Sequence, residues 1–442
     1  MTNHSDDHLG LFDDPDEDAT GEVDLQELRE ALSRHGEPGP EARRSASRTV
    51  ARREHRARER RRRTRRVRST LIAVLVMALI AGAVVVGLVV WRRSTEVPTD
   101  WAGVGGTVVV VRVQSGDGLT DVAQTLVDAG VVANAETFVS VAKDNAAIKG
   151  LQPGFYMVHQ HSSSRAVVGE LADADSRVGE LRITPGQTLA DRTAVATSGA
   201  QTTREGIVSA IAKACVPTDG RAQCFSTDAL WKVAETASLS DLGVVGWAVD
   251  DVRKAPDPRK RLEGLILPGD YDIAPGSTAQ QALFTVISAS ASEWNTTGIV
   301  AAAKDQDVTP YQLATIASLV QSEGLAPDMP KIARVIDNRL SIGKKLEFDS
   351  TVNYGLDRAQ ISTTDSERLD SANVYSTYAH QGLTPTPIGS PGPDALDAAA
   401  DPASGSWLYF VAVDLEGHTC FSTTDTEHEA CVAKARANGV FG

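Results

Sequence analysis

The larger part of this 442-residue chain is short of positive charge. Beyond residue 68 there are 28 basic and 43 acidic side chains, whereas a nucleic-acid-binding domain needs a basic folded surface. This composition therefore argues against a nucleic acid as partner. The exception is residues 43–68, with 14 Arg and two Glu, which follow an acidic stretch, residues 1–42, with 13 acids and two bases.

Two signatures of common enzyme classes are also missing. No Gly-x-Ser-x-Gly sequence occurs, which argues against a hydrolase with a Ser-His-Asp triad. The glycine cluster Gly103-Val104-Gly105-Gly106 is not followed by a predicted helix, so it does not form a nucleotide-binding loop. Phosphoryl transfer is accordingly disfavoured.

Cysteine is rare, and its four copies form two local pairs, all beyond the apolar stretch at 71–91. Local pairs are typical of disulfides in an oxidising compartment. The spacing predicts disulfides between Cys215 and Cys224 and between Cys420 and Cys431. A zinc site formed by the second pair with His418 and His428 is the alternative, although neither spacing matches a common zinc finger.

Leu71 to Trp91 is 21 residues long and has no charged side chain. About 20 apolar residues cross a bilayer as a helix, so we predict a transmembrane helix within residues 69–93. The run is longer than the apolar part of a signal peptide. Because the Arg-rich segment lies before it, we expect the N-terminus in the cytoplasm, a single-pass cell-membrane protein, and the lipid bilayer as a partner through residues 71–91.

The remaining composition divides the chain further. Residues 1–68 have few large apolar side chains and are predicted to be a disordered cytoplasmic tail, and residues 94–106 are predicted to be a linker. Alternation over 107–114, helical spacing from Leu119 to Gly130, a second helix at 138–142 and a strand at 154–158 predict a small α+β module over 107–180. It looks like the LysM-like region of a glycan-binding protein; a generic α+β packing module is the alternative.

Residues 181–442 are predicted to form a mainly helical α+β domain, so the fold class is α+β. We expect a strand at 181–184, helices near 188–197 and 203–214, a short buried strand within 262–271, and a helix from Ala279 to about Trp294.

The helix best defined by its sequence is Pro310–Glu323, with Thr309 as its cap and Gly324 after it. Glu323 shares a face with the apolar Ile316 and Val320, so we expect a carboxyl group at the end of a buried stripe. Loss of water and the helix dipole should raise its pKa, which suits a general acid. The alternative is an ion pair with a buried arginine, Arg334 or Arg339.

Polar residues follow in a pattern that could form a site. A second helix, capped by Asp328, has Asn338 and Arg339 near its end. Asp349, Thr351 and Tyr354 then lie in a predicted loop with enough hydrogen-bonding groups to hold a sugar, although each could equally be a turn or cap residue.

Six stretches in order resemble the YceG-like endolytic murein transglycosylases, enzymes that cut the glycan strands of bacterial peptidoglycan. The resemblance covers about residues 105–442, and Gln321 stands where many members have a second glutamate. The matching stretches are LEG at 262–264, LATIASLVQSE at 313–323, ARVIDNRLSIGKKL at 333–346, FDSTVNYG at 348–355, GLTPTPIGSPG at 382–392, and Leu408–Val411 with Gly417-His418.

The resemblance implies that Glu323 is the catalytic acid and base of a lytic reaction that leaves 1,6-anhydro ends, with no metal or other cofactor. It implies peptidoglycan strands as substrate and penicillin-binding polymerases as partners. A non-catalytic glycan-binding or division scaffold and a hydrolytic muramidase are the alternatives. The residues expected to bind substrate or to support the glutamate are Glu263, Asn338, Arg339, Asp349, Thr351, Tyr354 and Tyr378.

Overall fold

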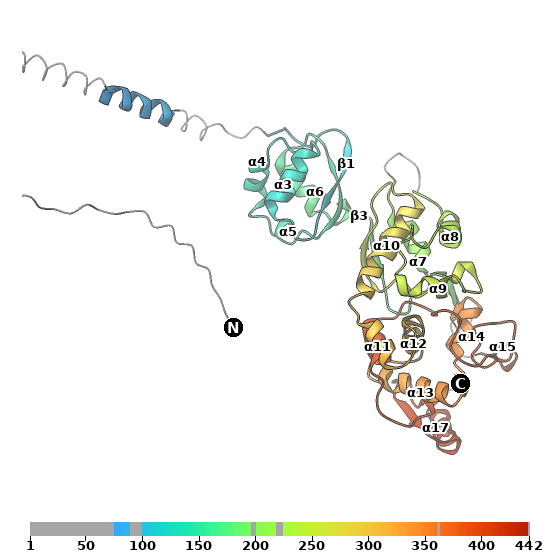
Figure 1. Ribbon diagram of the computed structural model, residues 1–442. Coiled ribbons are helices and arrows are strands. Elements are labelled where there is room, and N and C mark those ends of the chain that lie inside the picture. Colours follow the sequence, from blue (N-terminus) through green and yellow to red (C-terminus); the bar gives the residue numbers. More distant parts are fainter. Residues whose placement is uncertain (1–74, 89–99, 196–199, 218–223, 360–362, 441–442) are drawn as a thin grey trace, which may run out of the picture. The chain divides into compact units, whose positions relative to one another are not determined.

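The computed structural model describes residues 75–88, 100–195, 200–217, 224–359 and 363–440 (Figure 1). The chain divides into two compact units, residues 1–97 and 98–442, each of which is described by itself. The described residues combine helices with short, mostly antiparallel strands, so the α+β prediction is confirmed.

The transmembrane prediction is corrected by this structure. Within unit 1 the described residues, 75–88, are helical. No helix among the described residues is long and apolar enough to cross a membrane. This finding contradicts the predicted transmembrane helix and the single-pass membrane localisation derived from it; residues 69–74 and 89–93 of that prediction lie outside the described residues. The predicted tail, residues 1–68, lies outside the described residues.

The first part of unit 2 is a small module around a three-stranded sheet (Figure 1). Its strands are antiparallel and ordered β1-β2-β3. Alternation holds in β1, where Val111 and Val113 are buried and Arg112 is exposed. The predicted strand, helix, helix, strand order is confirmed. The elements are β1 (Val108–Val113), α3 (Leu119–Asp128), α4 (Ala135–Ala142), α5 (Ala146–Lys149), β2 (Gly154–His159), α6 (Ser164–Ala172) and β3 (Arg177–Val178).

The strand predicted at 181–184 is confirmed, whereas a strand replaces the helix expected at 188–197. β4 (Glu180–Ile183) pairs with β7 (Gly269–Asp272), and β5 (Arg192–Val195) pairs with both β6 (Gln201–Arg204) and β8 (Arg358–Ala359). The predicted helix at 188–197 is therefore wrong, and the one at 203–214 is shortened to α7 (Ile207–Ala214). Local helical spacing was overridden by pairing with β8, more than 150 residues further along the chain.

The short buried strand predicted within 262–271 is found only at its end. The apolar side chains of residues 262–267 are buried as expected, but the strand, β7, begins only at Gly269. Gly264 has a φ of +73° and makes a turn inside the segment. A Cβ there would lie 2.3 Å from Pro387, so only glycine allows this close approach.

Helices enclose the core of this region. The structure confirms α10 (Ala279–Trp294) and α12 (Pro310–Glu323), because capping and the buried stripe agree in both. α13 (Met329–Ser341) packs closely on α12 at Gly324, where a Cβ would lie 2.1 Å from Ile332. The others are α8 (Thr227–Thr236), α9 (Val249–Val252), α11 (Ile299–Asp305), α14 (Asp349–Gly355), α15 (Asp365–Arg368) and α16 (Pro393–Ala400).

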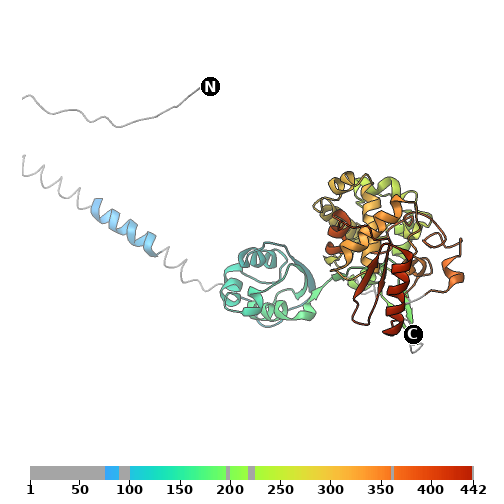
Figure 2. The ribbon, with the colours of Figure 1, turned by 90° about the horizontal axis from the view of Figure 1, so that it is seen from below.

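The chain closes with a hairpin and a helix, which lie side by side in red in Figure 2. β9 (Tyr409–Ala412) pairs with β10 (Thr419–Ser422), and α17 (Asp425–Ala437) packs on both. A disulfide joins Cys420 of β10 to Cys431 of α17, and a second joins Cys215 to Cys224. Thiolates held in disulfides cannot bind zinc, which removes the alternative zinc site.

Candidate active site

Glu323 is the last residue of α12, at the end of a helix whose other core-facing side chains are fully buried. Thr309 caps the helix by accepting a hydrogen bond from the backbone N–H of Gln312, and Pro310 occupies the first helical position. The side chain of Glu323 itself is only partly buried. The chain thus places one carboxyl group where a packed helix meets the surface.

A groove of about 440 Å³ runs past this carboxyl group. One wall is formed by the turn at Pro185-Gly186 and by the arginines of β5 and β6, Arg192 and Arg204. Residues 321–323 of α12 and polar side chains of α14 form the rest. The groove is therefore lined mainly by polar and charged groups, which can donate or accept hydrogen bonds with the hydroxyl groups of a sugar.

Ser350 is the immediate partner of Glu323. Its hydroxyl donates a short hydrogen bond to Oε1 of Glu323. The pKa of the Glu323 carboxyl is nevertheless raised from 4.5 to about 7. Burial is the main cause, the negative charge of Asp349 adds to it, and the hydrogen bonds from Ser350 act in the opposite direction. Near neutral pH the group can therefore exist in both protonation states.

The alternative of an ion pair with a buried arginine does not hold. Arg334 donates to the carbonyl oxygens of Pro402 and Ala403 and approaches Asp337. Arg339 donates to main-chain oxygens and to Glu347. Within the described residues no salt bridge involves Glu323. Its pKa is thus not held down by a cation.

Asp349 lines the same groove but is firmly engaged elsewhere. Arg368 donates two hydrogen bonds to it, each of 3.0 Å, and the hydroxyl of Thr363 donates a third of 2.6 Å. Tyr378 lies nearby, and burial followed by the charge of Asp349 raises the pKa of its hydroxyl. A carboxylate held by three donors is a poor nucleophile or base.

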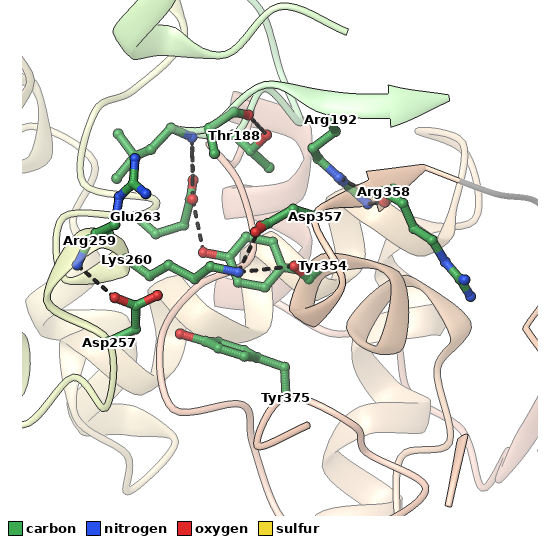
Figure 3. Close-up of polar contacts among 12 residues, drawn as sticks. Thr188, Arg192, Asp257, Arg259, Lys260, Glu263, Tyr354, Asp357, Arg358 and Tyr375 are labelled. Carbon is green, nitrogen blue, oxygen red and sulfur yellow. Dashed lines mark hydrogen bonds and ion pairs between the residues drawn. The ribbon is translucent and has the colours of Figure 1, made fainter. Parts of the chain in front are cut away.

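Glu263 lies in a different cavity, which shares only Arg192 with the lining of the groove, and Figure 3 shows its polar contacts. It is 1% exposed, and the cavity beside it, about 10 Å³, has room for at most one water molecule. The backbone N–H of Leu189 donates to both of its oxygens, at 3.1 and 3.2 Å, and Tyr354 donates to Oε2 at 2.9 Å. Burial raises the pKa of Glu263 to about 7, against the hydrogen bonds and the nearby Lys260.

Three of the predicted substrate-binding residues have structural partners instead. Asn338 donates to the carbonyl oxygens of Gly405 and Trp407. Arg339 holds the carbonyl of Leu408 at 2.6 Å, which anchors the end of β9 to α13. Thr351 is fully buried and contacts Phe348 and Thr377. None of the three lines the groove of Glu323.

Sequence reasoning missed several groups that line the groove. Ser350 and Asn353 lie on α14, which we had predicted to be a loop, and the neighbouring position of Asp349 was the only hint of them. Arg192 and Arg204 were missed because their segments were predicted to be helices. Their alternating β pattern over a short hairpin would have been the relevant indication.

Comparisons with known proteins agree with the sequence motifs. The model of the YceG-like family matches residues 111–434, and the chain therefore belongs to this family.

Among characterised relatives, a Bacillus subtilis protein named endolytic murein transglycosylase is 27% identical over 332 residues, which cover 74% of this chain and 85% of the relative. A Streptococcus pneumoniae protein of the same name is 30% identical over 181 residues, 40% of this chain. The chain spans only about a third, 32%, of that pneumococcal relative. A crystal structure of a YceG-like protein from Listeria monocytogenes is 24% identical, with a TM-score of 0.47, and covers 74% of this chain and 99% of its own.

Proposed function

We propose that this protein is an endolytic peptidoglycan transglycosylase that cleaves the bond between N-acetylmuramic acid and N-acetylglucosamine. The observation that carries the proposal is the carboxyl group of Glu323, unpaired with any described cation, beside a polar groove and with a pKa of about 7. The name of the relatives supports the choice of substrate.

The proposed reaction uses this one carboxyl group twice. Protonated Glu323 gives its proton to the glycosidic oxygen as the bond to C1 of the muramyl residue breaks. The 6-hydroxyl oxygen of the same residue forms a new bond to C1, and its proton returns to Glu323. No water is consumed, and the strand ends in a 1,6-anhydro ring. Hydrolytic glycosidases instead use two carboxyl groups.

The partners of the other two carboxyl groups favour this reaction over hydrolysis. Asp349 is held by Arg368 and Thr363, and Glu263 is buried and does not line the groove. Neither is free to activate a water molecule or to attack C1. Ser350 is positioned to orient the Glu323 carboxyl during both proton transfers.

Product analysis on purified glycan strands tests the proposal. We expect anhydro-muramyl ends, which differ in mass by one water from the reducing ends that a hydrolytic muramidase forms. Reducing ends would contradict the lytic mechanism. Cuts within long strands would support a role in terminating glycan elongation, and co-purification with penicillin-binding polymerases tests the partnership that such a role implies.

Two substitutions beside Glu323 should move the pH profile in opposite directions. Activity should fall above pH 7, because the carboxyl group must be protonated to act as an acid. Ser350→Ala removes hydrogen bonding that lowers the pKa, so the alkaline limb should move up by about one pH unit. Asp349→Asn removes a nearby negative charge, so the limb should move down by a smaller amount.

The measurement is kcat/KM from pH 5 to pH 9 on soluble glycan strands. Circular dichroism of each variant controls for folding, since Asp349→Asn also weakens the contact with Arg368. A shift of both variants in the same direction would show that Glu323 does not set the alkaline limb.

A cavity in the small module favours a second, non-catalytic function in glycan binding. It measures about 300 Å³ and lies where the β1–α3 turn meets the end of α5, beside Asp117, Leu119 and Lys149. If the protein is only a glycan-binding scaffold, Glu323→Gln should leave both binding and products unchanged. If it is the proposed enzyme, binding should persist while product formation stops.

A further inference from the structure

Two arginines face each other across the hairpin that forms one wall of the groove. Arg192 of β5 and Arg204 of β6 are direct cross-strand partners, and both line the groove of Glu323. Side chains in this relation have Cβ atoms about 5 Å apart, and like charges placed so destabilise a hairpin. The arginine pair is therefore expected to destabilise the β5–β6 hairpin.

The acidic residues of the groove do not compensate this charge. Asp349 is paired with Arg368, and Glu323 takes its hydrogen bond from Ser350. Within the described residues the side chain of Arg204 has neither a hydrogen bond nor an ion pair, and β6 is exposed along its whole length. The charge of Arg204 is thus available to a ligand in the groove.

Arg192 is held in place by two of its guanidinium nitrogens, and the third is left to donate to a ligand. Its Nε and Nη2 donate to the carbonyl oxygen of Arg358, on the neighbouring strand β8, and Figure 3 shows the side chain reaching in that direction. Arg192 also lines the cavity that contains Glu263. The charge of Glu263 offsets part of the positive charge of Arg192. Nη1 remains without a partner among the described residues.

We propose that Arg192 and Arg204 form a subsite for a carboxylate carried by the muramyl residue of the strand that is cut. The inference rests on the proposed function, because it takes its ligand from that substrate. The muramyl residue bears a lactyl group that ends in a carboxylate, or in a stem peptide with carboxylates of its own. Arginine binds such groups through paired hydrogen bonds. The glycan strand in the groove would thereby be oriented with this muramyl residue toward the hairpin.

The test compares Arg204→Gln with Arg204→Lys and with Arg436→Gln, which removes the same charge from an exposed position on α17. Three substrates of equal length separate the sources of the carboxylate. They are strands with stem peptides, strands stripped of peptides so that the lactyl carboxylate is free, and stripped strands with that carboxylate converted to an amide.

We expect Arg204→Gln to raise KM about tenfold on a carboxylate-bearing strand and to leave kcat unchanged, with partial recovery in Arg204→Lys. An effect confined to peptide-bearing strands assigns the site to the stem, and one confined to stripped strands assigns it to the lactyl group. An equal rise on the amidated strand, or no rise on any strand, would overturn the proposal. Full activity of Glu323→Gln would instead overturn the proposed function.

Discussion

Glu323→Gln is expected to reduce kcat by about a thousandfold or more, since a single general acid or base typically contributes 10²–10⁴. Here the same group would serve in both roles, so no neighbour can take over either proton transfer. Gln keeps the size of the side chain and can still accept the hydrogen bond from Ser350. Substrate binding should therefore persist, with KM changed by less than about threefold.

The stability of the same variant provides a second measurement. Burial raises the pKa of Glu323, so the folded protein disfavours the ionised form. This cost is absent below the unfolded value of 4.5, grows between there and about 7, and is constant above. Glu323→Gln should accordingly be more stable than the parent at pH 8, by about 1 kcal/mol after allowance for partial exposure, and not at pH 4.

The control for both measurements is Glu416→Gln, because Glu416 is exposed and lies outside the groove. It should keep full activity. Retained activity in Glu323→Gln, measured as anhydro-product formation, would remove this carboxyl group from the mechanism.

Glu263→Leu is expected to lower the free energy of unfolding by about 3 kcal/mol at pH 5, because a buried donor without a partner costs about 1–3 kcal/mol. The substitution leaves two such donors, the backbone N–H of Leu189 and the hydroxyl of Tyr354. The loss should be smaller at pH 8. There the parent itself holds an ionised, buried carboxylate, since the folded pKa is raised to about 7.

Glu263 also joins the two sides of the groove. Leu189 follows the turn at Pro185-Gly186, and Tyr354 belongs to α14, the helix of Ser350. We therefore expect Glu263→Leu to lower kcat as well, although its side chain is too enclosed to touch a sugar. In this proposal Glu263 is a positioning residue.

A double-mutant cycle with Tyr354→Phe isolates the contact. Phe removes the donor, so the double variant should lose less stability than the two single losses together. Urea unfolding at pH 5 and pH 8 gives the values, and Glu263→Gln, which retains one acceptor oxygen, should lose about 1 kcal/mol. Strict additivity would mean that the hydrogen bond does not stabilise the fold.

Local sequence features were sufficient for some elements and insufficient for others. α12 was predicted to the residue because Thr309, Pro310 and Gly324 act on the backbone next to them. α14 was predicted to be a loop, since Phe348 before it provides no side-chain cap and its seven residues are too few for a clear period. The hairpin β5–β6 depends on β8, which no local window contains.

The same division applies to the candidate site. The sequence by itself determined that a carboxyl group ends an apolar helical stripe, because the spacing of a helix places Ile316, Val320 and Glu323 on one face. Only the tertiary structure decided its surroundings. It brought Ser350 to Glu323, engaged Asp349 with Arg368, buried Glu263 in a separate cavity and set two arginines on the wall of the groove. The physical reason is that spacing along a helix is local, whereas desolvation and charge depend on chain segments that meet only when the protein folds.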